Sequence, residues 1–145
     1  MPVMDNLQKY PLLHPALGQV HVHCLGKRQD PEELASAAVA MFESFLFVLF
    51  PILGRSGSLA LFRRSLRLTE DAFPCYREAR VAEEDALLNA VGTCLRQAPN
   101  IAQASMALLN TFAELLATFI GEPLTRQLMQ DAWPHILSFP FEASR

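Results

Sequence analysis

Cysteine is scarce in this chain of 145 residues, with only Cys24, Cys75 and Cys94. An odd number of cysteines at wide spacing excludes a small fold built on a disulfide framework. An excess of one charge is also absent, because 12 Lys and Arg against 15 Asp and Glu give a net charge of −3. The chain therefore lacks the basic character of a nucleic-acid-binding domain, and no nucleic-acid partner is predicted.

The sequence also lacks the short motifs that carry well-known chemistry. It contains neither GxSxG nor HExxH, and none of its cysteines stands in a recognisable reactive setting. Its first ten residues, MPVMDNLQKY, do not show the charged and then apolar layout of a signal peptide. These absences predict a cytoplasmic protein that is not an enzyme and needs no cofactor.

Apolar residues are abundant, at 51% of the chain, and this favours one compact domain over residues 1–145. Two apolar stretches, 34–53 and 101–120, approach the roughly 20 residues that span a bilayer. Each carries a single charge near its centre, Glu43 or Glu114, where a charge is costly in lipid. We therefore expect two core helices of a bundle and no membrane span.

Capping residues, proline and glycine divide the chain into about five expected helices. Asp30 precedes Pro31 and Glu33 in the pattern of a capping box, and Gly54 is the expected end of that helix. The fold class predicted is an all-α compact bundle with a helical core over 30–137 and an irregular tail over 138–145. The other expected helices run from about Ser58 to Thr69, from about Glu83 to before Pro99, from Asn100 to Gly121, and from Pro123 to Pro134.

Residues 1–29 are rich in proline and glycine, which predicts an irregular or extended arm. Within this arm, 19–25 alternates between apolar and polar residues, and a period of two is typical of a half-buried strand. A lone strand leaves its backbone groups unpaired, so we expect the same strand of a second copy to pair with it.

An internal repeat is one reading of the two long helices. Aligning Gly54 with Gly121 places residues 34–54 over residues 101–121, with several identities. The repeated unit would be a long apolar helix, a glycine and a short amphipathic helix. Any two buried amphipathic helices also match through their common period, so both readings stay open.

Phenylalanine surrounds the first long helix instead of lining one side of it. The side that does not face the core needs cover, which a second subunit would supply. The leading hypothesis is therefore a non-catalytic protein–protein interaction or regulatory domain that acts as a homodimer. The predicted dimer surface consists of Phe47, Phe50, Val20 and Val22.

A second hypothesis is a domain that senses or carries a small apolar ligand between the two long helices. The residues expected to line that pocket are Met41, Phe45, Met106, Leu109 and Phe112.

Two polar clusters are weaker candidates. Four arginines gather around the second expected helix, and they predict either a partner-binding or anion-binding site or a solvated face. His21 and His23 would share one face of the expected strand and could contact a metal, although zinc sites take three or four ligands. The arginines are Arg55, Arg63, Arg64 and Arg67.

Overall fold

The computed structural model describes residues 13–137, and this part of the chain contains helices and no β-strand. The all-α prediction is confirmed. The helices are α2 (Leu13–Leu25), α3 (Pro31–Leu53), α4 (Arg55–Thr69), α5 (Tyr76–Ala79), α6 (Leu87–Arg96), α7 (Ile101–Ile120) and α8 (Glu122–Ala132), with a 3₁₀ turn, η1 (Glu84–Ala86), before α6. The described part thus has more helices than the five expected, because α2 and α5 were not predicted. The predicted tail, 138–145, and the first twelve residues lie outside the described residues.

The strand predicted over 19–25 is wrong, because these residues form the second half of helix α2. Leu13, Leu17 and Val20 follow the helical period and are fully buried. Pro15 falls in the first turn, where its missing N–H breaks no helical hydrogen bond. Burial of one face of this thirteen-residue helix against α3 and α7 outweighs the short alternating pattern. The described part of the arm is therefore a helix packed into the domain, and Val20 cannot form part of a dimer surface.

The two long helices begin and end where the sequence predicts. The Asp30 carboxylate accepts a hydrogen bond from the backbone N–H of Glu33 at 3.2 Å, and Asn100 Oδ1 accepts one from Gln103 at 3.0 Å. Helices α3 and α7 end at Gly54 and Gly121, whose φ angles are +81° and +94°. With ψ near 150°, this is a backbone conformation that essentially only glycine adopts.

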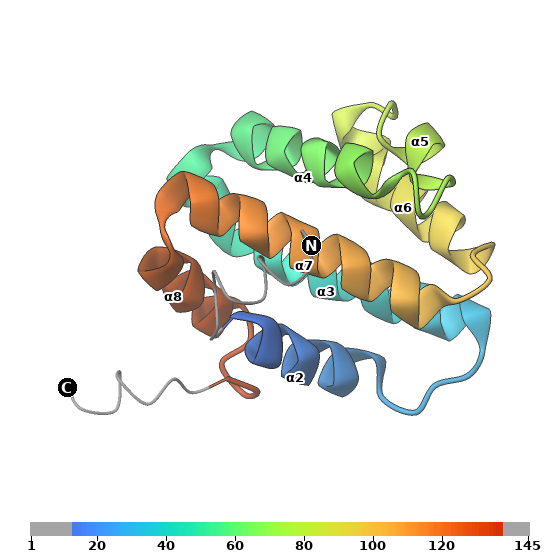
Figure 1. The fold of residues 1–145 in the computed structure, drawn as a ribbon, viewed down its shortest axis with the longest axis horizontal. Coiled ribbons are helices and arrows are strands. Elements are labelled where there is room, and N and C mark those ends of the chain that lie inside the picture. Colours follow the sequence, from blue (N-terminus) through green and yellow to red (C-terminus); the bar gives the residue numbers. More distant parts are fainter. Residues whose placement is uncertain (1–12, 138–145) are drawn as a thin grey trace.

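Helices α3 and α7 lie side by side at the centre of the bundle and run in the same direction (Figure 1). The junctions that follow them therefore lie at the same end of the molecule, on the left in Figure 1. Helix α4 returns along one side, α2 covers another, and α6 packs against α3.

Aromatic rings fill the centre between these helices. Phe45 and Phe112, one from each long helix, meet edge to face with their centroids 5.5 Å apart. Phe62 of α4 lies 5.3 Å from Phe112, and Trp133 lies 5.0 Å from Phe45. All four side chains are buried, so the long helices enclose a packed aromatic cluster.

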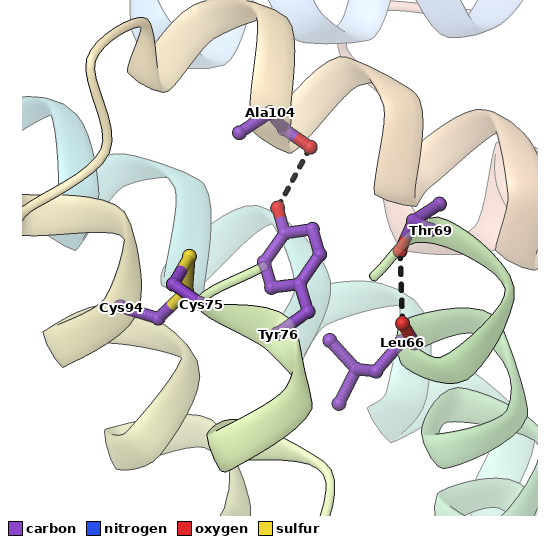
Figure 2. Close-up of a disulfide and its surroundings, with 6 residues drawn as sticks. All are labelled: Leu66, Thr69, Cys75, Tyr76, Cys94 and Ala104. Carbon is purple, nitrogen blue, oxygen red and sulfur yellow. Dashed lines mark hydrogen bonds between the residues drawn. A yellow bond between two sulfur atoms is a disulfide. The ribbon is translucent and has the colours of Figure 1, made fainter. Parts of the chain in front are cut away.

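A disulfide that the sequence did not predict joins the α4–α6 connection to the bundle. Cys75 and Cys94 are bonded, with their Cα atoms 5.4 Å apart (Figure 2). Beside them the buried Tyr76 hydroxyl donates a hydrogen bond to the carbonyl of Ala104 at 2.7 Å. This burial raises the pKa of the Tyr76 hydroxyl well above its ordinary value. The short helix α5 is thus anchored to both α6 and α7.

Two described helices, α3 and α7, have the length and the hydropathy of a membrane-crossing helix. A core helix of a globular protein meets the same two criteria, so length and composition alone do not assign either helix to a membrane.

Candidate interaction surface

The outer face of α3 is not covered by any other described helix. Ser36, Ala40, Glu43 and Phe47 are exposed and recur at steps of three and four, so they form one stripe along the helix. Phe47 stands out, because 75% of its surface is open to solvent. The opposite face of α3 carries Met41 and Phe45 into the core. The core-facing side of α3 is therefore covered, while a large apolar side chain, Phe47, remains on the side that faces solvent.

This stripe forms one wall of a groove between α3 and α6. A hollow of about 630 Å³ lies beside Phe47, with Leu88 and Asn89 on its α6 side and Asp131 at its α8 end. A second hollow, of about 190 Å³, continues it toward Ser36 and Gly92. The two hollows share Glu43, Leu88 and Asn89, so they lie next to each other; together they are termed the α3–α6 groove.

The larger hollow of the α3–α6 groove has a negative rim. Its carboxylates are Glu43, Glu84, Asp85 and Asp131, and its cation is Arg55. Arg55 pairs with Asp85 at 3.0 Å and also lies over the Phe50 ring, 5.6 Å from its centroid. Both members of that pair are exposed, so the pair contributes little stability. The rim keeps an excess of three negative charges around an apolar floor.

The four arginines predicted as one cluster do not form a single site. The Arg63 guanidinium donates hydrogen bonds to the backbone carbonyls of Arg80 and Ala82, so it holds the α4–α6 connection. Arg55 pairs with Asp85 in the groove, while Arg64 and Arg67 are exposed on α4. The four arginines therefore have different surroundings, although they are close in sequence.

A second ion-pair cluster fixes the same connection. Glu70 contacts Arg80 at 2.5 Å and Arg77 at 3.5 Å. The hydrogen bond from Arg80, followed by the charge of Arg80, lowers the pKa of the Glu70 carboxyl below its ordinary value. These contacts keep α5 and the turn after it close to α4.

The two candidate metal ligands lie apart. His21 is buried, with its Nε2 atom 2.8 Å from Ser105 Oγ, whereas His23 is exposed. Burial lowers the pKa of His21, and a backbone hydrogen bond with Ala102 opposes that effect. Residues two apart on a helix point in different directions, so the shared face expected for a strand does not exist. In residues 13–137 no group of three His, Cys, Asp or Glu side chains is placed to hold a metal ion.

The residues of the predicted ligand pocket pack into the core. Met41, Phe45, Leu109 and Phe112 are buried, and Met106 packs against them while half-buried. None of the five lines the α3–α6 groove. The aromatic cluster occupies the space that an apolar ligand would need.

The four residues of the predicted dimer surface do not lie on one face. Phe47 is exposed in the groove, and Phe50 lines the same groove beneath Arg55 while half-buried. Val22 is 71% exposed on α2, whereas Val20 is in the core.

Sequence reasoning missed the groove's charged rim. Glu84, Asp85 and Asp131 come from η1 and α8, which are distant from α3 in sequence. The periodicity of α3 alone identified Phe47 as outward-facing, but no sequence signal placed α6 beside it. Glu114, the single charge of the second apolar stretch, lies 2.8 Å from His14 of α2.

Comparison of the chain with protein-family models, with curated proteins and with solved structures finds no significant match.

Proposed function

We propose that the chain is a non-catalytic protein-interaction domain that binds its partner over the α3–α6 groove. The observation that carries the proposal is Phe47, an aromatic side chain that is three-quarters exposed in the larger hollow of the groove, which has a charged rim. An aromatic anchor inside a polar rim is the usual anatomy of a protein–protein interface.

The positions of the perturbed titratable groups support a non-catalytic role. Catalytic groups tend to combine a shifted pKa with a position in a cleft. Within residues 13–137 the groups with a shifted pKa are His21, Cys24, Glu70 and Tyr76, and none of these four lines the α3–α6 groove. Burial inside the domain or surface ion pairing accounts for each shift.

The partner predicted from the sequence is a second copy of the chain. Exposure of Phe47 and Val22 is compatible with that homodimer, but burial of Val20 removes one of its four predicted contacts.

We also infer that the α3–α4 and α7–α8 units are an internal structural repeat. The equivalent hydroxyls Ser58 and Thr125 donate to the carbonyls of Gly54 and Gly121 at 2.7 and 2.8 Å. Both glycines share one unusual backbone conformation. These matched junctions support a pseudo-twofold relation between the units.

The cytoplasmic location stays a proposal, and the Cys75–Cys94 bond bears on it directly. Stable disulfides are rare in the reducing cytosol, so an oxidised Cys75–Cys94 pair is unusual for a cytoplasmic protein. Rapid acid quenching of source cells followed by thiol alkylation tests the location. A reduced pair in cells supports the cytoplasm, and an oxidised pair contradicts it.

The experiment that tests the interaction function is site-specific photo-crosslinking in source cells. A photoreactive phenylalanine analogue replaces Phe47, and the control places it at Val81, which is 70% exposed but outside the α3–α6 groove. We expect discrete protein adducts from position 47 and none from position 81. No protein adduct at position 47, or equal adducts at both positions, would contradict the proposal.

A further inference from the structure

We infer that the occupant of the α3–α6 groove is a basic amphipathic helix of another protein. This inference rests on the proposed function and specifies the partner for the same surface. Three properties of the groove support it: its length, the placement of its apolar and small residues, and its charge.

The length suits about three turns of helix. From Ser36 to Phe47 the exposed stripe of α3 extends about 17 Å, at roughly 1.5 Å per residue. The two hollows follow one another along this stripe, because both include Glu43, Leu88 and Asn89. A helix of about 12 residues laid along α3 would contact the whole groove.

The two ends of the groove differ in depth and in chemistry. Phe47, Val48 and Phe50 give one end an apolar lining that can receive an aliphatic side chain. The other end has small residues, Ala40 and Gly92, beside Ser36. A Cβ atom at Gly92 would lie 3.2 Å from Val39, so α6 already packs closely on α3 there. A partner helix would insert apolar residues at the Phe47 end and pass closely over the small residues.

The charge specifies the polar side of that helix. Glu43 lies midway along the groove, and Glu84, Asp85 and Asp131 surround its apolar end. Among the described residues, Asp85 is the one of these four that has an ion-pair partner. At the far end the charge of Arg96 is met by Glu32, at 3.6 Å. Lysine or arginine side chains flanking the apolar stripe of a partner would therefore find unneutralised carboxylates.

The same charge disfavours a second copy of this chain as the occupant. Two copies that meet through this groove would bring Glu43 and the acidic rim of each against those of the other. Like charges brought together across an interface weaken association, so the predicted isologous dimer would be opposed by its own surface.

A peptide titration tests the inference with the intact purified chain. The probe is a fluorescent peptide of about 14 residues with leucines on one helical face and lysines on the other. One control peptide has glutamate in place of every lysine. A second has the same composition as the probe in a scrambled order that destroys its amphipathic face. We expect saturable binding of the probe alone, weakened by added salt.

Matched variants locate the binding site. Phe47→Ala should weaken the affinity for the probe peptide at least tenfold, because an anchor side chain carries a large share of the binding energy of such an interface. Glu43→Gln should weaken the affinity for the probe peptide several-fold and make this affinity less dependent on salt. The controls Val81→Ala and Glu78→Gln change exposed residues outside the groove and should leave the affinity unchanged. All four positions are exposed, so circular dichroism should show an unaltered fold.

The possible outcomes separate the two proposals. Equal binding of the scrambled or the acidic peptide, or equal loss in the control variants, overturns the basic-helix inference. Absence of peptide binding together with protein adducts at position 47 overturns it too, but leaves the interaction function standing. An adduct of twice the chain's mass identifies a second copy and also overturns it. Absence of both peptide binding and protein adducts removes both proposals.

Discussion

Truncation of Phe112 is the sharpest test of how the bundle is held together. The Phe112 ring is fully buried and lies 5.5 Å from Phe45 and 5.3 Å from Phe62, near edge to face with both. Phenylalanine-to-alanine changes in a core lower the free energy of unfolding by about 3–5 kcal/mol, and a part of that loss, about 0.5–1.5 kcal/mol, belongs to each aromatic pair that is broken. Because Phe112 takes part in two such pairs, we expect Phe112→Ala to fall in the upper part of that range, at about 4–5 kcal/mol, against a total stability of about 5–15 kcal/mol for a typical domain.

The matched control is Phe119→Ala, on the same helix but 68% exposed. A surface change of this kind should alter stability by no more than about 0.5 kcal/mol. Urea unfolding followed by far-ultraviolet circular dichroism gives both values when the slopes of the transitions agree. Equal losses in the two variants, or a loss below about 1 kcal/mol for Phe112→Ala, would show that the long helices do not depend on the aromatic cluster.

Three further perturbations test other parts of the structure. Reduction of the Cys75–Cys94 bond, whose partners are 19 residues apart, should lower the free energy of unfolding by about 3 kcal/mol; an unchanged urea midpoint after reduction and alkylation would contradict this. Gly54→Ala should lower the free energy of unfolding by about 1–3 kcal/mol, because Gly54 has a positive φ. Gly18→Ala should raise it by about 0.5–1 kcal/mol, because an added Cβ in α2 meets nothing within 4 Å. The midpoint of thermal unfolding should therefore shift in opposite directions for the two variants. The pKa of His21 is lowered in the folded state, so as the pH falls His21 is protonated in the unfolded chain before it is protonated in the folded one. The contribution of neutral His21 to stability is therefore lost as the pH falls below about 6.5. Unfolding at pH 7.5 and 5.5 should show a larger decrease in the wild type than in His21→Gln, and equal decreases would refute the buried neutral state.

The features that could be predicted from the sequence are those set by local chemistry. Asp30 and Asn100 cap their helices through side chains three residues from the N–H groups they bind, and Gly54 ends α3 through its own backbone conformation. The helical period of α3 also placed Phe47 outside. Each of these signals lies within a few residues of its effect.

The features that could not be predicted depend on packing between distant segments. Helix α2 forms because Leu13, Leu17 and Val20 gain burial against α3 and α7, and a window of seven residues does not show this. The carboxylates of the groove rim line one hollow because α6 and α8 pack on α3. The disulfide likewise depends on α5 reaching α6.

A heteronuclear NMR titration of the labelled 16.2 kDa chain with the basic amphipathic peptide would locate the interaction surface residue by residue. We expect saturable amide shifts confined to the α3–α6 groove, with the largest at Glu43, Phe47, Leu88 and Asn89. Shifts that cluster instead on the exposed arginines of α4, or no saturable shifts, would contradict the claim that this groove is the interaction surface.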